Sequence, residues 1–191
     1  VSTDDPEIAE VARSYGAEVP FLRPAKFAQD DTTDLLVFSH AIEWFKENEN
    51  FVPDLWVQLR PTSPLRPPGL IERAIKMLEE NPEADCLRTV RETPMTPYKM
   101  WKWEKKYIQP FAQLDGKESY NMPRQALPKV FSQDGILDII KTSTCLKENS
   151  LTGNLILPLE IKGPYLTVDI DVPVDLIVAE VFYQYNAKIN E

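Results

Sequence analysis

The stretch LWVQLRPTSPLRPPGLIERAIKMLEENPEADCLRTV, residues 55–90, carries the clearest signal of architecture in the chain. Its two ends, 55–59 and 85–90, are short and mainly apolar, which predicts strands. Between them a proline-rich loop precedes apolar residues at helical spacing, namely Leu70, Ile71, Ala74, Ile75 and Leu78. A strand, a helix and a strand at this spacing predict a βαβ unit and therefore a parallel sheet.

The rest of the chain extends this pattern. Further helices are predicted at 6–15, after the Asp5 cap, and at 35–45, 144–148 and from about Pro173; further strands are predicted at 135–140 and 155–161. Asp134-Gly135 indicates a turn before its strand, and Pro158 suits an edge strand. The last helix is predicted to bury Leu176, Ile177, Val181 and Tyr185. We expect an α/β protein: one domain over 1–191, a three-layer α/β/α sandwich with a mostly parallel, Rossmann-like sheet.

One segment departs from this pattern. Residues 92–113 crowd aromatic and methionine side chains together with four lysines, and Glu104-Lys105-Lys106 predicts a hairpin turn. Such a cluster packs on the same core or forms an arm against another subunit, because aromatic residues and methionine are enriched in interface cores. We favour an arm over 92–125.

Composition limits the classes of partner. The chain has 191 residues, 43% hydrophobic and 27% charged, with a net charge of −9. An acidic balance argues against a nucleic-acid groove or an anionic membrane surface, since both require clustered cations, but a nucleotide needs only a few. No apolar run is long enough to cross a membrane. Cys86 and Cys145 are typical of small core residues in a reducing compartment, which predicts a cytoplasmic protein.

Residues 167–176, TVDIDVPVDL, bring two carboxylates close together. In an extended chain, Asp169 and Asp171 point to one face. Their mutual repulsion would be relieved by Mg²⁺, whose shell is often completed by substrate phosphates. The same residues also suit the start of a helix, with Asp171 as the N-cap and Asp175 near the positive end of the dipole.

Two polar segments suit an anionic ligand. The loop 59–66 follows a predicted strand and offers Arg60, Ser63 and Arg66 on a proline-stiffened backbone; arginine binds carboxylates and phosphates through paired hydrogen bonds. Arg124 and Gln125 suit an acidic sugar. Both segments are also compatible with surface arginines, and Asp134 with a structural role. His40, the one histidine, lies mid-helix beside the apolar face, where a structural role is favoured.

Five segments in matching order resemble the acylneuraminate cytidylyltransferases, or CMP-sialic acid synthetases. This group includes CMP-KDO synthetases and enzymes that activate legionaminic-type sugars. The segments are Val1–Asp4, Phe21–Ala25 with Ala28–Thr32, Leu59–Arg66, Pro123–Gln125 with Leu127-Pro128, and Val168–Asp171 with Asp175-Leu176. Each is modest, but together they span nearly the whole chain.

The resemblance implies that the anomeric hydroxyl of a 2-keto sugar acid, sialic or legionaminic in type, attacks the α-phosphate of CTP and releases pyrophosphate. It implies a fold of the nucleotide-diphospho-sugar transferase type, with Asp169 and Asp171 as catalytic ligands of Mg²⁺. It places Arg23 and Asp34 on the nucleotide side, and implies sugar-acid contacts from Arg60, Ser63, Arg66, Arg124, Gln125, Asp134 and Asp138. It also implies a homodimer through Tyr98–Phe111, reaching toward the partner's site.

The chain departs from the family in three places. The glycine-rich nucleotide loop of the family lies upstream of Val1, so we expect these residues alone to bind CTP weakly. Arg60 replaces a glutamine, and 134–138 read Asp-Gly-Ile-Leu-Asp where sialic-acid enzymes have Asn-Gly-Ala-Ile-Tyr. Because such changes alter hydrogen-bond donors and charge, the sequence indicates a cytidylyltransferase more firmly than it names the sugar.

Two other functions fit the same residues. A glycosyltransferase also uses an Asp-x-Asp pair to hold a metal against a nucleotide-sugar, but that pair usually lies mid-chain with an acceptor region after it. A non-catalytic assembly module is compatible with the aromatic arm. Using a nucleotide-sugar in place of CTP would identify the first, and a dimer that binds neither substrate would identify the second.

Overall fold

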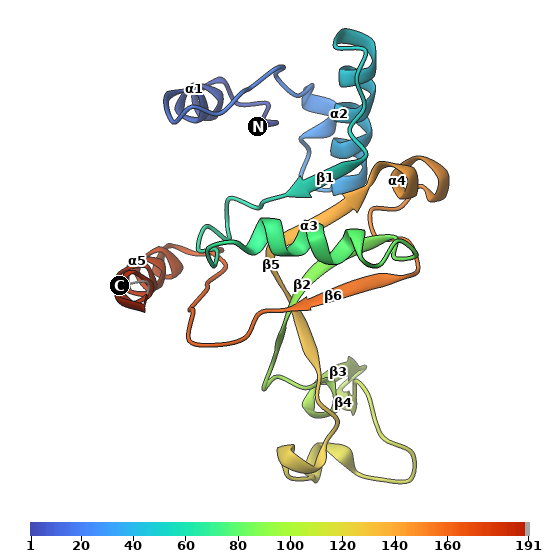
Figure 1. The fold of residues 1–191 in the computed structure, drawn as a ribbon. Coiled ribbons are helices and arrows are strands. Elements are labelled where there is room, and N and C mark those ends of the chain that lie inside the picture. Colours follow the sequence, from blue (N-terminus) through green and yellow to red (C-terminus); the bar gives the residue numbers. More distant parts are fainter. Residues whose placement is uncertain (190–191) are drawn as a thin grey trace. The chain divides into compact units, whose positions relative to one another are not determined.

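A computed structural model describes residues 1–189, which divide into two compact units (Figure 1). The first unit holds 1–58, 74–87 and 139–157; the second holds 59–73, 88–138 and the chain from Pro158 onward. No helix in the described part of the chain has the length and apolar character needed to span a membrane.

The first unit contains three whole α-helices of the described chain and part of a fourth. These are α1 (Pro6–Ser14), α2 (Asp34–Asn48), α4 (Thr142–Glu148) and the end of α3 (Leu70–Glu79), with the short strand β1 (Leu55–Gln58). Asp5 caps α1 as predicted, since its Oδ1 accepts hydrogen bonds from the backbone N–H groups of Glu7 and Ile8. The apolar spacing of α2 places Ala41 and Ile42 in the core.

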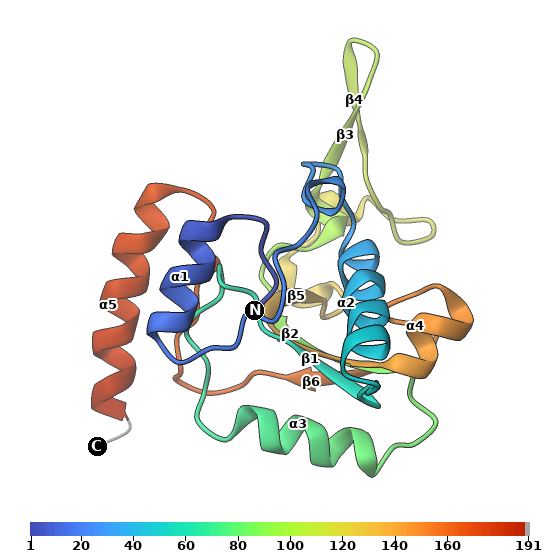
Figure 2. The ribbon, with the colours of Figure 1, turned by 90° about the horizontal axis from the view of Figure 1, so that it is seen from above.

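The main sheet has the strand order β1-β5-β2-β6, with β2 at Cys86–Glu92, β5 at Phe131–Lys141 and β6 at Ile156–Glu160. The apolar middle of β5 forms the centre of the core: Ile136, Leu137 and Ile139 are fully buried. β6 is an edge strand, as Pro158 predicted. Helices and strands alternate along the chain and the four strands form one sheet, so the α/β class is confirmed. The ribbon is shown in two views in Figures 1 and 2.

The sheet is mixed. Backbone bonds join Asp85 to Leu155 and Ile161 to Val90, so that β2 and β6 run in the same direction. Thr93 N–H donates to the carbonyl of Val130, and Leu137 N–H donates to Thr89 Oγ1. Residue numbers therefore fall along β5 as they rise along β2, so these two strands run in opposite directions. A mostly parallel, three-layer arrangement is therefore not confirmed.

The second unit carries a hairpin. β3 (Trp101–Glu104) and β4 (Tyr107–Pro110) pair antiparallel, with Trp103 opposite Ile108. Lys105, in the left-handed region at φ 56°, turns the chain where Glu104-Lys105-Lys106 predicted it. Three short 3₁₀ helices flank the hairpin in the chain. η2 (Pro97–Lys99) precedes it, and η3 (Ser119–Asn121) and η4 (Arg124–Ala126) come after it. Figure 2 shows the hairpin extending away from β2 and β5.

Two local predictions were wrong. Asp134-Gly135 is not a turn before β5 but lies within it, with Gly135 at φ 70°. The segment 167–170, for which the sequence left an extended chain and a helix start open, has no regular secondary structure. In α5 (Pro173–Ile189) the predicted inward residues Leu176, Ile177, Val181 and Tyr185 are exposed, while Ala179 and Asn186 are buried. Asn186 is held by both backbone groups of Leu166, which explains why a polar residue lies inward there.

Candidate functional site

An ionic cluster lies at the middle of β5 in the second unit. Asp138 is 3% exposed. Its Oδ1 accepts a hydrogen bond from Arg88 Nε at 2.8 Å, and its Oδ2 accepts from Arg88 Nη2 at 3.2 Å and Arg60 Nη1 at 3.0 Å. Because β5 lies between β1 and β2 in the sheet, the strand order brings together two arginines that flank one carboxylate. Arg60 and Arg88 therefore share the carboxylate of Asp138.

Arg66 fixes the backbone of the same loop. Its Nε donates to the carbonyl of Ile136 at 3.0 Å, and its Nη2 donates to the carbonyl of Arg60 at 2.7 Å. Burial lowers the pKa of Arg66, but a guanidinium stays charged near neutral pH. Arg60 is thereby held at its carbonyl by Arg66 and at its side chain by Asp138.

Ser63 connects the loop to the acidic segment near the chain's end. It is 1% exposed, and its Oγ lies 3.2 Å from Asp169 Oδ1 and 3.5 Å from the carbonyl oxygen of Asp134. One residue further on, Ile170 N–H donates to the carbonyl of Thr62 at 2.8 Å. Residues 106 positions apart in sequence thus meet at one point.

Gly135 makes room for this contact. A Cβ at Gly135 would lie 3.0 Å from Ser63 Oγ, which is tighter than nine in ten Cβ contacts in real proteins, so that the hydroxyl would have to shift. The left-handed backbone at φ 70° also favours glycine. The glycine is therefore required by the approach of the Ser63 loop to β5, and not by a turn.

Asp134 combines a structural role with an unsatisfied atom. Its Oδ1 lies 2.6 Å from Thr89 Oγ1 and accepts the backbone N–H of Ile136 at 3.2 Å. Its Oδ2 is buried and has no hydrogen-bond partner within residues 1–189. A buried polar atom without a partner is rare in a folded protein.

Asp169 and Asp171 are exposed, whereas Val168 and Ile170 are half-buried, which is the alternation expected of an extended chain. Asp171 is not the N-cap of α5, because the helix begins at Pro173 and the residue directly before it is Val172. Asp175 Oδ2 instead accepts the backbone N–H groups of Asp171 and Val172, both at 2.9 Å. The helix start therefore leaves the Asp171 carboxylate outside the cap.

The described residues do not build a complete metal cage. No group of three or more histidine, cysteine, aspartate or glutamate side chains able to hold a metal occurs within 1–189. Mg²⁺ commonly takes only one or two protein carboxylates together with substrate phosphates and water. Asp169 and Asp171 fit that smaller requirement, because both are exposed oxygen ligands.

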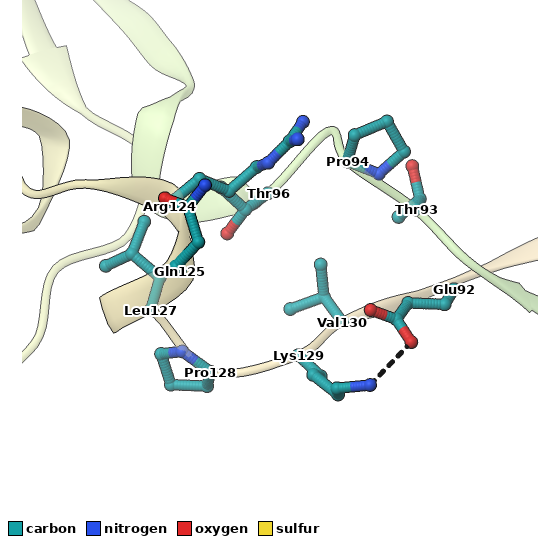
Figure 3. A pocket seen from close by; sticks show the side chains of 10 residues that line it. All are labelled: Glu92, Thr93, Pro94, Thr96, Arg124, Gln125, Leu127, Pro128, Lys129 and Val130. Atoms are coloured by element: carbon teal, nitrogen blue, oxygen red, sulfur yellow. Dashed lines mark hydrogen bonds and ion pairs between the residues drawn. The ribbon is translucent and has the colours of Figure 1, made fainter.

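Arg124 and Gln125 lie elsewhere in the second unit. They line a cavity of about 530 Å³, together with Glu92, Thr93, Pro94, Thr96, Leu127, Pro128, Lys129 and Val130. Figure 3 shows Arg124 and Gln125 on one side of it and the Lys129–Glu92 ion pair, at 2.8 Å, on the other. The hydrogen bond and charge of Glu92 raise the pKa of Lys129. The Arg60 cluster and the two C-terminal aspartates do not line this cavity.

The two residues predicted on the nucleotide side lie in the first unit. Arg23 N–H donates to the carbonyl of Thr3, and its guanidinium lies 3.7 Å from Asp4. Arg23 Nε is buried and without a hydrogen bond to any described residue. Asp34 Oδ2 accepts Gln58 Nε2 at 3.0 Å.

His40, also in the first unit, is a packed residue, as favoured from the sequence. Its ring meets those of Phe21 and Phe27 at centroid distances of 4.9 and 5.1 Å. Burial is the main cause that lowers the pKa of His40.

Sequence reasoning missed Arg88 and Thr89, because both lie inside the strand β2 and not in a loop. One feature of the sequence does single out Arg88: it is a charged residue between Leu87 and Val90, inside a mainly apolar run that predicts a buried strand. A charge inside a buried strand requires a partner, and Asp138 provides it.

The fold and the site define an α/β protein whose second unit carries an arginine-rich cluster and two exposed aspartates. The chain belongs to the cytidylyltransferase family, whose pattern it matches over residues 1–151.

Individual relatives extend this result. The chain is 28% identical over 153 residues to post-translational flagellin modification protein B of Campylobacter coli, covering 80% of this chain and 63% of the relative. It is 25% identical over 194 residues to CMP-N,N'-diacetyllegionaminic acid synthase of Legionella pneumophila, covering 98% of this chain and 78% of the relative. The second match includes the Asp169 segment, which lies beyond the family pattern.

A solved structure shares the fold. CMP:2-keto-3-deoxy-manno-octonic acid synthetase, solved in complex with CTP, superposes with a TM-score of 0.60 at 12% identity, covering 98% of this chain and 80% of that one. At this identity the likeness shows the fold alone.

Proposed function

We propose that the protein transfers CMP from CTP to the anomeric hydroxyl of a 2-keto sugar acid and releases pyrophosphate. One observation carries this proposal: Ser63 Oγ lies 3.2 Å from Asp169 Oδ1, so the arginine-bearing loop and the acidic segment meet within one unit. Such a site offers cations for an anionic substrate beside carboxylates for a divalent metal. Membership of the cytidylyltransferase family supports CTP as the donor.

The substrate class is proposed from the relatives and from the charges. A relative that covers 98% of this chain is named for a legionaminic-type acid, which carries a carboxylate. Arg60 and Arg88, which share the carboxylate of Asp138, would offer guanidinium groups to this carboxylate. Arg66 and Ser63 keep the loop in place, so that its cations do not have to be ordered when the anion binds.

Asp169 and Asp171 are the proposed ligands of Mg²⁺. When bound, the ion would shield the triphosphate charge from the incoming hydroxyl. The protein's own contribution is to orient one ligand, since Ser63 holds Oδ1 of Asp169 while Asp175 fixes the backbone that leads into Asp171.

The hairpin is proposed as a dimerisation arm. Trp103, Tyr107 and Phe111 are 79%, 63% and 62% exposed, which is unusual for three large aromatic side chains within nine residues. The Arg124–Gln125 cavity lies in the same unit but is not lined by the Arg60 cluster. We propose that it serves the sugar-acid site of the partner subunit.

The buried cysteines suit a reducing compartment, so we place the reaction in the cytoplasm.

Pyrophosphate release tests this function. The natural full-length protein would be assayed with CTP and Mg²⁺ against sialic, legionaminic and KDO-type acids. A double variant, Asp169→Ala with Asp171→Ala, removes the proposed metal ligands; a matched control, Glu72→Ala with Glu79→Ala, removes two exposed carboxylates of α3. We expect sugar-dependent release that the first variant loses and the control keeps.

The outcomes separate the alternatives. Release that does not depend on a sugar acid, or that survives in the Asp169/Asp171 variant, contradicts the mechanism. A folded protein that is inactive with CTP but consumes a nucleotide-sugar is a glycosyltransferase. A folded dimer that binds neither substrate is an assembly module.

A further inference from the structure

Residues 161–172 form a linker between β6 and α5, and they carry the two exposed aspartates without regular secondary structure. The linker and α5 hold each other at two points. Asn186 bonds both backbone groups of Leu166, and Asp175 Oδ2 accepts two backbone N–H groups just before the helix. These contacts alone do not fix the aspartates within the second unit, so the contacts from the rest of that unit to the linker decide where they lie.

Two other parts of the second unit reach the linker beside its aspartates. The loop before α3 holds it through Ser63, whose Oγ lies 3.2 Å from Asp169 Oδ1. Strand β2 holds it through Arg91, whose Nη2 donates a hydrogen bond to Thr167 Oγ1 at 3.1 Å. Asp169 is therefore held directly by the loop, and the chain just before it is held by the strand.

Arg91 is an unusual choice for its place in the strand. It is half-buried, and its Nε is buried without a hydrogen bond to any residue within 1–189. The acidic side chains of β2, β5 and β6 bond other residues: Glu92 bonds Lys129, Asp134 bonds Thr89 and Ile136, Asp138 bonds Arg60 and Arg88, and Glu160 bonds Lys162. An apolar side chain would lose less hydration at this point. The arginine is therefore better explained by what it holds than by the strand that carries it.

Thr167 is well placed to orient both aspartates. It lies two residues before Asp169 and four before Asp171, and exposure alternates along 168–171. Side chains two residues apart point to the same side of an extended chain, so Thr167 shares the side of both carboxylates. A rotation of the chain at Thr167 would therefore change the direction of both carboxylates.

We propose that Arg91 is a positioning residue for a divalent cation: by holding Thr167 from β2, it fixes the direction of Asp169 and Asp171. Outer partners of this kind set the orientation of the ligands before the ion binds, and their loss typically lowers metal affinity about 10- to 100-fold. The inference rests on the proposed function for the metal. It adds a residue of strand β2 to the groups that serve the acidic linker.

Electron paramagnetic resonance of Mn²⁺ tests this inference on the natural full-length protein, because the signal of the free ion falls as the ion binds. Mn²⁺ takes oxygen ligands as Mg²⁺ does. Thr167→Val removes the hydroxyl but keeps the shape and the charge, whereas Thr167→Ser keeps the hydroxyl. Arg91→Met removes the guanidinium but keeps a long stem. Asp169→Ala with Asp171→Ala removes the proposed ligands.

Lys162→Met is the matched control. Lys162 lies in the same linker, and its exposed ammonium pairs with Glu160 at 2.9 Å. Both methionine variants remove one positive charge near the aspartates. On charge alone, each would bind Mn²⁺ at least as tightly as the wild type, because a nearby cation repels the ion. A weaker affinity in Arg91→Met therefore indicates lost positioning and not a changed charge.

We expect Thr167→Val and Arg91→Met each to bind Mn²⁺ about tenfold more weakly, at the lower end of the effect of an outer partner. The variant that combines both changes should be no weaker than the weaker single variant, because both changes remove the same contact. Thr167→Ser should bind as the wild type does, and Lys162→Met should bind at least as tightly. The aspartate double variant should lose the binding.

Two results would overturn the inference. One is a wild-type protein that shows no Mn²⁺ binding dependent on Asp169 and Asp171. The other is a folded Thr167→Val variant with wild-type affinity; this variant decides the matter if Arg91→Met does not fold. A purely structural contact would lower the melting temperature of Thr167→Val without changing its affinity for Mn²⁺.

The proposed function fails separately. If the wild type binds Mn²⁺ and Thr167→Val weakens that binding, but no acid leads to pyrophosphate release, the inference stands and the transferase assignment falls. If the wild type releases pyrophosphate and Thr167→Val keeps the wild-type affinity for Mn²⁺, the transferase stands and the role of Arg91 falls.

Discussion

Replacing Gly135 by alanine should damage both stability and activity, for separable reasons. At φ 70° an alanine pays the left-handed backbone penalty of about 1–2 kcal/mol. Its Cβ would also lie 3.0 Å from Ser63 Oγ. Ser63 is 1% exposed and cannot swing into solvent, so overpacking adds about 1–3 kcal/mol.

The expected loss of unfolding free energy is thus about 2–5 kcal/mol. In a chain of this size each kcal/mol lowers the melting temperature by about 2–4 °C. The displaced hydroxyl also loses its position against Asp169 Oδ1, now 3.2 Å away. We expect pyrophosphate release to fall about tenfold or more, because small misplacements of positioning groups carry large rate costs.

Gly116 provides the matched control. It has φ 65°, but a Cβ there meets nothing within 4 Å. Urea denaturation of Gly116→Ala should therefore show the backbone penalty alone. Adding Ser63→Ala to Gly135→Ala removes the hydroxyl that the new Cβ approaches. The double variant should regain the part of the unfolding free energy that this contact costs, but it should not regain activity. Equal stability losses for the two single glycine variants, with unchanged activity in Gly135→Ala, would refute this reasoning.

Three further outcomes follow from the structure. The N–H groups of Leu155 and Asn154 lower the pKa of Asp85, so its stabilisation is present above the unfolded pKa and lost as pH falls; melting curves from pH 6 to 3 should be flatter for Asp85→Asn than for wild type. Burial lowers the pKa of His40 below 6.5, so stability should fall on acidification from pH 7 to 5, and less so in His40→Phe. Trp103→Ser should shift sedimentation toward the monomer without changing the melting temperature of that monomer; an unchanged dimer contradicts the arm.

Local elements were predictable where one signal was sufficient. The Asp5 cap, the apolar spacing of α3 and the turn at Lys105 each depend on residues close in sequence, and the structure confirms them. Gly135 shows the limit of such signals. Asp-Gly is typical of turns because glycine adopts positive φ, and Gly135 does so, but inside a strand that another loop approaches.

The site required knowledge that local patterns do not contain. Arg60 and Asp138 are 78 residues apart, and only the strand order, with β5 between β1 and β2, brings them together. The candidate residues of the loop were found because arginines after a strand are conspicuous. Arg88 was not found, since its role depends on a partner in the neighbouring strand. The exposed face of α5 was missed for a related reason: periodicity shows that a face is apolar but not what it packs against.

The energetics of the cluster also bear on its purpose. Taking ions out of water is costly, and replacing a complete buried ion cluster by apolar residues of similar volume is often neutral or stabilising. Removing Asp138 alone would leave two guanidiniums without their shared counter-charge, which typically costs about 3–5 kcal/mol. Each of the three charged residues is thus needed for stability once the other two are present. The sheet would nevertheless be as stable with apolar residues at all three positions. What the set does provide is a pair of partly exposed arginines that one carboxylate holds in a fixed orientation.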